Sequence, residues 1–196
     1  MPRLVSVQVA LPGPFLEREG RPVVTAIGKR RVEGTVEVLP LGLAGDGVGD
    51  PRVHGGPRKS VYAYPTEHYA FWRRERPEMA LSFGVFGENL SLEGLTEADV
   101  RPGDRLEIGT ARFVVTQPRS PCATLALRFG RPTFVREFYA AGRSGFYLGV
   151  ERVGTLRAGD PVHLERTGDD GPTIAELYGR NRSEFLAEAV RSGGAP

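Results

Sequence analysis

The sequence is poor in cysteine, in net charge and in long apolar runs, and each shortage excludes a class of protein. Cys122 is the single cysteine among 196 residues, which excludes an intramolecular disulfide, a CxxC redox pair and an all-cysteine metal cage. The formal net charge is only +2, too small to predict nucleic-acid or membrane binding. No apolar run approaches the roughly 20 residues of a membrane-spanning helix. These features predict a cytoplasmic protein with neither nucleic-acid nor membrane partners.

Glycine and proline, by contrast, are abundant, with 26 and 16 residues. Such frequent turn formers favour many short strands over a helical bundle. Period-two alternation, bounded by Gly, Pro or Asp, predicts strands at residues 4–9, 23–27, 35–39, 59–64, 105–108, 112–116, 146–150 and 162–164. The predicted fold is mainly β, and a closed barrel of about seven to eight strands suits it better than alternating βαβ units.

Helical patterns are few. Residues 65–76 are predicted to form a helix, because Tyr64, His68 and Trp72 recur at intervals of four and Pro65 suits a first turn. Residues 133–141, with one apolar face, are also predicted to form a helix. Thr173 and Glu176 fit a capping box at the start of a C-terminal tail that is long enough for two short helices. The polar, turn-forming residues before it predict a boundary, with a body over 1–167 and a short helical tail over 168–196.

Cys122 is the strongest candidate for a reactive or metal-binding residue. It follows a predicted strand directly, and Pro118 and Pro121 restrict the backbone that leads to it. Arg119 lies three residues away, and a nearby cation stabilises the thiolate, which is the form that acts as a nucleophile or a soft-metal ligand. A buried thiol used only for packing is the alternative interpretation. The residues themselves do not choose among these roles.

A glycine-rich segment at 42–57 contains Asp46, Arg52 and His54. Its glycines would let backbone amides approach a ligand, and Arg52 could hold an oxyanion with two hydrogen bonds. The alternative is an ordinary glycine-rich connection. Lys29 belongs to a short basic run, which would usually form a solvated surface. A zinc site that combines His54, His68 and Cys122 is a further alternative, although these residues have no recognised ligand spacing.

Several short motifs follow one another along the chain. They are Lys-Arg-Arg-Val-Glu-Gly at 29–34, Gly-Leu-Ala-Gly-Asp at 42–46, Val-His-Gly-Gly-Pro at 53–57, Tyr-Pro-Thr-Glu-His-Tyr at 64–69, Phe-Gly-Glu-Asn-Leu at 86–90 and Gln-Pro-Arg-Ser-Pro-Cys at 117–122. In content and order the set resembles the MOSC domain, which is named for the C-terminal part of molybdenum cofactor sulfurase, and within it the bacterial YiiM-like subgroup.

This resemblance implies a closed MOSC-type β-barrel and a site for a pterin-based molybdenum cofactor, molybdopterin. Cys122 matches the position that binds molybdenum. Four further matching residues are implied to bind the anionic cofactor or a substrate anion: Lys29, Arg52, His54 and Arg119. Asp46 and Asn89 also match, and the resemblance implies that they order the loops or contact the pterin. His68 falls on a matching motif and is implied to be a pocket residue.

The resemblance also implies an oxidoreductase that reduces N-hydroxylated compounds, such as hydroxylaminopurine base analogues, by cleaving the N–O bond. The electrons would come from a separate flavin-containing reductase, with His54 or His68 as the catalytic proton source beside Cys122. The alternatives are a non-catalytic cofactor carrier or sulfur-handling binding protein, and a cofactor-free barrel with a structural cysteine. A homodimer is one possible oligomeric state of such a protein. The tail is shorter than the roughly three helices common in this subgroup.

Overall fold

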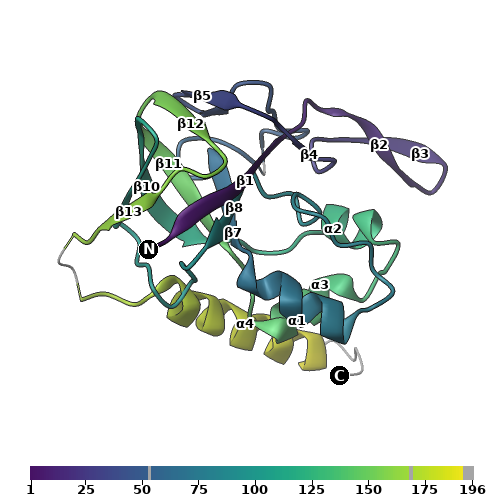
Figure 1. Ribbon diagram of the computed structural model, residues 1–196. Helices are drawn as coiled ribbons and strands as arrows, with labels where there is room; N and C mark the ends of the chain where they lie inside the picture. Colours follow the sequence, from purple (N-terminus) through teal and green to yellow (C-terminus); the bar gives the residue numbers. More distant parts are fainter. Residues whose placement is uncertain (53, 168–169, 192–196) are drawn as a thin grey trace.

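The computed structural model describes residues 1–52, 54–167 and 170–191, and it is built mainly of β-strands (Figure 1). The largest sheet has eight strands in the order β13-β9-β10-β11-β7-β8-β1-β4. These strands are β1 (Arg3–Val9), β4 (Arg30–Arg31), β7 (Val61–Pro65), β8 (Leu90–Glu93), β9 (Arg105–Ile108), β10 (Ala111–Pro118), β11 (Phe146–Arg152) and β13 (Val162–Glu165). Neighbouring strands are antiparallel except β7 and β8, which are parallel.

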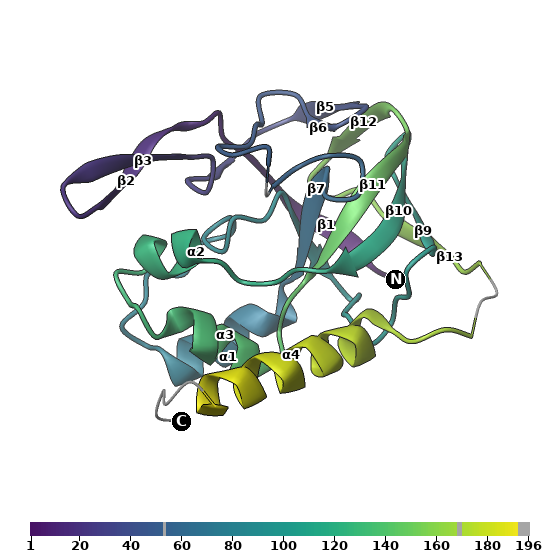
Figure 2. The same ribbon diagram turned by 180° about the vertical axis from the view of Figure 1, so that it is seen from behind.

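Two smaller sheets and four helices complete the described chain. One sheet joins β5 (Thr35–Leu39), β6 (Gly42–Leu43) and β12 (Gly154–Arg157), and the other is a hairpin of β2 (Gly13–Arg18) and β3 (Arg21–Thr25), which extends away from the main sheet (Figure 2). The helices are α1 (Glu67–Glu75), α2 (Ala123–Arg128), α3 (Phe134–Ala141) and α4 (Ile174–Arg191). No described helix is both long and apolar enough to cross a membrane.

The predicted strands all overlap strands of the structure, and the two predicted helices correspond to α1 and α3. The prediction missed β2, β4, β6, β8, β12 and α2. β4 and β6 have two residues each, too few to show an alternation. The described part of the tail, residues 170–191, contains one helix rather than two. Tyr139 explains this continuity, because its ring stacks on Tyr178 at 5.5 Å and on Phe185 at 4.2 Å, one on each side of Gly179.

The prediction of a closed barrel was wrong, because the main sheet is a curled half-barrel that remains open. Its edge strands, β13 and β4, do not pair with each other in the described chain. At one end a single bridge between Arg3 and Pro161 draws β1 towards β13, with a hydrogen bond of 2.9 Å from the Leu4 amide to the Asp160 carbonyl. β5, β6 and β12 pair with one another in a separate sheet. They therefore do not bridge the two edges of the large sheet, which would be needed to close a barrel.

Strand β7 separates two hydrophobic cores, since its side chains alternate between the two faces of the sheet. Val61 and Ala63 belong to the core inside the half-barrel, whereas Tyr62 and Tyr64 belong to an aromatic core beneath the helices. Every residue of β7 is therefore buried. Trp72 of α1 joins the aromatic core and donates a hydrogen bond of 2.8 Å from its indole nitrogen to the Tyr64 hydroxyl. The two cores together hold the loops that surround the pocket.

Candidate functional site

A pocket opens where four loop segments meet: residues 25–29, 46–49, 54–60 and 86–89, beside the end of β10. It contains about 700 Å³ of space, counting its mouth, which is open to solvent. Its walls carry four basic side chains together with a thiol and two phenols: Lys29, His54, Lys59, Arg119, Cys122, Tyr62 and Tyr147. Asp46 is the one carboxylate among the described lining residues. This balance of charge suits an anionic ligand.

Cys122 stands at the junction between β10 and α2. β10 ends at Pro118, and the chain continues through Pro121 to Cys122, which is the N-cap of α2. The Cys122 backbone is extended (φ −129°, ψ 168°), and its side chain is partly exposed on the pocket wall. The two prolines restrict the backbone of this connection, so the thiol is presented from a defined position.

Arg119 is buried without a counter-ion. Only 5% of the residue is exposed, and its guanidinium forms no ion pair with a carboxylate of the described chain, although a hydrogen bond joins it to the Tyr147 side chain. The guanidinium carbon lies 5.4 Å from the Tyr62 ring centroid and 5.3 Å from that of Phe138. Its Nη1 atom is buried and has no hydrogen-bond partner in the described structure. A buried charge in this state is costly, and an anion in the pocket would supply the missing partner.

Lys29 and Asp46 form a buried ion pair on another wall. Asp46 also accepts hydrogen bonds of 2.8 Å from the Asn89 side-chain amide and from the Ala10 backbone. Burial lowers the pKa of Lys29, and the attraction of Asp46 opposes that effect. Asn89 accepts a 3.1 Å hydrogen bond from the Tyr62 amide, which ties this cluster to β7. The cluster orders the loops and adds little net charge, so Arg119 and Lys59 carry the positive character of the pocket.

His54 lies half-buried on the pocket wall. Burial lowers its pKa, and the positive charges of Lys59 and Arg119 lower the pKa further, whereas Asp50 opposes them. The imidazole is therefore mostly uncharged near neutral pH. An anion bound beside it would raise its pKa and favour the protonated ring. His54 is thus a group whose proton would respond to occupation of the pocket.

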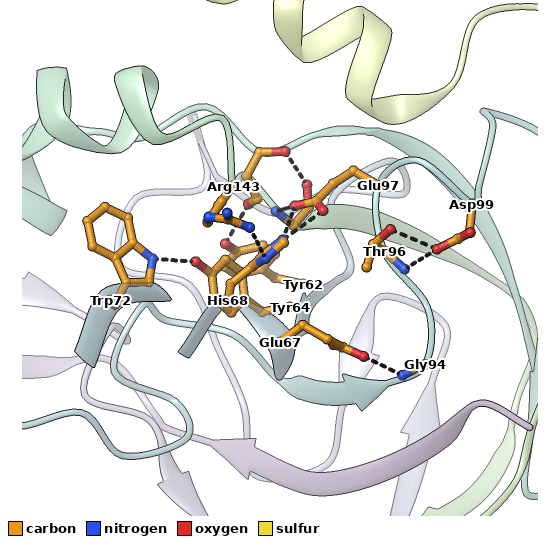
Figure 3. Close-up of polar contacts among 12 residues, drawn as sticks. Tyr62, Tyr64, Glu67, His68, Trp72, Gly94, Thr96, Glu97, Asp99 and Arg143 are labelled. Atoms are coloured by element: carbon orange, nitrogen blue, oxygen red, sulfur yellow. Dashed lines mark hydrogen bonds and ion pairs between the residues drawn. The ribbon is translucent and has the colours of Figure 1, made fainter. Parts of the chain in front are cut away.

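Two predicted site residues do not line this pocket. The Arg52 side chain is 87% exposed and is held by Asp50, with contacts of 2.9 and 2.8 Å to the two carboxylate oxygens. These hydrogen bonds from Arg52 lower the pKa of Asp50 to about 2. His68 is buried against Glu97 at 2.7 Å, outside the pocket lining (Figure 3). The other predicted residues come together: Lys29, Asp46, His54, Asn89, Arg119 and Cys122.

Sequence reasoning missed three chemically important pocket residues, Lys59, Tyr62 and Tyr147. Lys59 and Tyr62 lie within a predicted strand, where alternation predicts which residues share a face but not which face borders a pocket. Tyr147 lies on β11, far from every candidate motif. The zinc alternative is also not supported, because no group of three or more His, Cys, Asp and Glu side chains in the described ranges could hold a metal ion.

Comparison with known proteins agrees with this architecture. The family profile described as MOSC domain matches residues 50–163. The protein YiiM of Escherichia coli is 41% identical over 148 residues, which are 74% of this chain and 65% of the relative, so the chain spans less than two thirds of that protein. The uncharacterized protein YflK of Bacillus subtilis is 39% identical over 161 residues, 81% of this chain and 72% of the relative.

A crystal structure of YiiM from Geobacillus stearothermophilus is also similar, with a TM-score of 0.77 and 33% identity, and the match covers 94% of this chain and 85% of that one. A fungal relative from Gibberella moniliformis carries the name Reductase and is 31% identical over 148 residues, which are 74% of this chain and 26% of the relative.

The fold and the pocket define a class: a β-rich domain whose open half-barrel supports a cation-lined, thiol-bearing pocket. Within that class, the chain belongs to the MOSC domain family, because the family profile matches more than half of its residues.

Proposed function

We propose that the pocket binds a pterin-based molybdenum cofactor and that the protein is an oxidoreductase that reduces N-hydroxylated compounds. The observation that carries the proposal is the presence of two complementary groups in one pocket: the buried guanidinium of Arg119, whose Nη1 atom has no hydrogen-bond partner in the described structure, and the thiol of Cys122. The molybdenum cofactor combines the anionic phosphate of molybdopterin with a metal that accepts soft ligands. Arginine and cysteine are suited to these two parts.

The chain offers a residue for each part of the cofactor. Cys122 would bind the molybdenum through its thiolate, since thiolate is a soft donor. Arg119 would pair with the phosphate, because its planar guanidinium presents several donors to one anion, and Lys59 lines the same pocket. Asn89 and Asp46 would border the pterin from the wall that they share with Lys29.

When bound, the molybdenum would supply a two-electron redox centre, at which an N-hydroxylated compound, two electrons and two protons yield the amine and water. Residues of the protein itself would hold and transfer the protons. His54 holds or releases one according to the charge around it, as its lowered pKa indicates. Burial raises the pKa of Tyr147, so its phenol keeps its proton and can donate a hydrogen bond to an oxygen in the pocket. A separate flavin-containing reductase would supply the electrons.

The name of the fungal relative, Reductase, supports the general part of this proposal, a reductase activity. A cofactor carrier would use the same groups without turnover, so cofactor binding alone does not distinguish the two functions. The experiment therefore has two stages, cofactor content and then catalysis.

The first stage measures molybdenum and pterin in protein purified from a cofactor-competent host. We expect near-stoichiometric molybdenum in the wild type and a marked loss in Cys122→Ala. Ser120→Ala is the matched control, because Ser120 lines the same pocket with an exposed side chain. Absence of molybdenum and pterin from the wild type would refute the proposed cofactor.

The second stage measures reduction of a hydroxylaminopurine by the loaded protein with a chemical electron donor. Turnover that is lost in Cys122→Ala would support the enzyme. A loaded protein without turnover, which passes its cofactor to an apo-enzyme, would establish a carrier instead. A slower reaction in His54→Gln with unchanged molybdenum content would place His54 in proton transfer.

A further inference from the structure

Three polar side chains, none of which lines the pocket, form a hydrogen-bonded network, the His68–Glu97–Arg143 network (Figure 3). His68 projects from α1, Glu97 lies in the loop after β8, and Arg143 precedes β11. His68 and Glu97 are 5% and 3% exposed. The His68 Nε2 atom lies 2.7 and 3.0 Å from the two Glu97 carboxylate oxygens, and an Arg143 nitrogen lies 3.1 Å from His68 Nδ1.

The hydrogen bonds of this network run in one direction, from Arg143 through His68 to Glu97. A guanidinium can only donate, so His68 Nδ1 must accept from Arg143. The ring therefore carries its proton on Nε2 and donates it to Glu97. Arg143 is held in place by a second contact, since its guanidinium carbon lies 4.2 Å from the Phe71 ring centroid. Both ring nitrogens of His68 are thus committed to neighbours outside the pocket.

Glu97 connects this side-chain network to the turn that precedes β11. Its carboxylate also accepts a hydrogen bond from the Gly145 amide. The Gly145 carbonyl in turn accepts from the Arg119 amide at 3.4 Å. The adjacent Ser144 carbonyl accepts a 2.7 Å hydrogen bond from the Tyr62 hydroxyl. The same short turn therefore contacts both Arg119 and the tyrosine ring on which its guanidinium lies.

The turn itself tolerates little displacement. Gly145 has φ +63°, and a Cβ atom there would lie 2.5 Å from the Ala63 carbonyl and 2.7 Å from the Tyr62 ring. The backbone is therefore packed directly against β7. A shift of the turn after loss of the Glu97 hydrogen bond would be transmitted to Tyr62 and to the Arg119 backbone.

We infer that His68, Glu97 and Arg143 are positioning residues that hold the 143–145 turn so that Arg119 presents its guanidinium to an anion in the pocket. His68 acts through this side-chain network and does not exchange a proton with the reacting atoms. The inference rests on one part of the proposed function, the binding of an anion by Arg119. It does not require molybdenum, so inorganic phosphate serves as the probe.

The test compares His68→Gln, His68→Leu and Glu97→Gln by phosphate titration at constant pH, together with hydrogen exchange of the Gly145 amide. Glutamine can accept from Arg143 and donate to Glu97, so His68→Gln keeps both contacts, whereas leucine keeps neither. Glu97→Gln retains the volume and weakens the acceptor. We expect His68→Leu and Glu97→Gln to weaken phosphate binding by about five- to tenfold and to speed Gly145 exchange. We expect His68→Gln to bind like the wild type.

Ala70→Gly is the matched control for general destabilisation of α1. Ala70 is exposed in the middle of the helix, and glycine there costs about 1 kcal/mol of helix stability without changing a buried side chain. The substitution should lower the melting temperature and leave the phosphate affinity unchanged.

Three results would overturn the inference: wild-type affinity in His68→Leu, affinity in His68→Gln as low as in His68→Leu, or wild-type phosphate binding that is absent or insensitive to Arg119→Met. Failure of the proposed function would show differently, as protein without molybdenum whose phosphate binding still follows the expected pattern. The two ideas can therefore fail separately.

Discussion

Replacing Arg119 by methionine removes a buried charge and keeps much of the side-chain volume. Burial of an ion carries an effective cost of several kcal/mol, which a carboxylate would normally offset. In this structure the offsetting interactions are the ring contacts to Tyr62 and Phe138, at about 1 kcal/mol each, and a hydrogen bond with the Tyr147 side chain. Together they remain smaller than the burial cost, which leaves the guanidinium unfavourable by about 1–2 kcal/mol in the ligand-free protein. Arg119→Met should therefore raise the free energy of unfolding by that amount, or the melting temperature by about 2–8 °C.

The assay is thermal unfolding in phosphate-free buffer and then with increasing phosphate. Wild-type protein should gain stability as phosphate binds, because a ligand that binds only the folded state stabilises it. Arg119→Met should start higher and gain nothing. Arg105→Met is the control, since Arg105 forms a partly exposed ion pair with Glu151 at 2.8 Å. Its effect should stay within about 1 kcal/mol, with the phosphate-dependent gain retained.

A clear loss of stability in ligand-free Arg119→Met would refute this reasoning. It would mean that the guanidinium stabilises the ligand-free fold through its ring contacts and does not need an anion to offset its burial. A phosphate-dependent gain that persists in the variant would also refute it, because the anion would then bind elsewhere.

Trp72→Ala should lower the free energy of unfolding in urea by about 3–5 kcal/mol, because the indole is fully packed in the aromatic core at 2% exposure, and a loss below about 1 kcal/mol would contradict that packing. Glu137 predicts a pH effect. Although burial raises the pKa of Glu137, hydrogen bonds from Arg131, Thr133 and Arg76 bring it down to about 2, below its ordinary 4.5. Its contribution to stability is thus present above about pH 4.5 and lost as the pH falls towards 2. Glu137→Gln should be less stable than wild type at neutral pH, and the difference should shrink as the pH falls towards 2 in parallel denaturation curves. A stability difference that does not change with pH would exclude this ionisation.

The local parts of the fold could be predicted because they depend on neighbouring residues. Alternation along 105–108 and 146–150 predicted β9 and β11, since successive side chains of a strand point to opposite faces. Thr173 and Glu176 predicted the start of α4, where each contacts the other's backbone amide as a capping box requires. The residues around Cys122 likewise predicted a thiol after a strand, and Cys122 lies four residues beyond the end of β10.

Tertiary structure alone decided the closure of the sheet and the membership of the pocket. Strand pairing is a competition among distant segments, and the pairing of β5 with β12 left the main sheet open. Motif matches grouped Arg52 and His68 with Arg119, yet Arg52 pairs with Asp50 at the surface and His68 turns towards Glu97. Which way a side chain points depends on its available partners. Those partners are brought together only when segments tens of residues apart pack against one another.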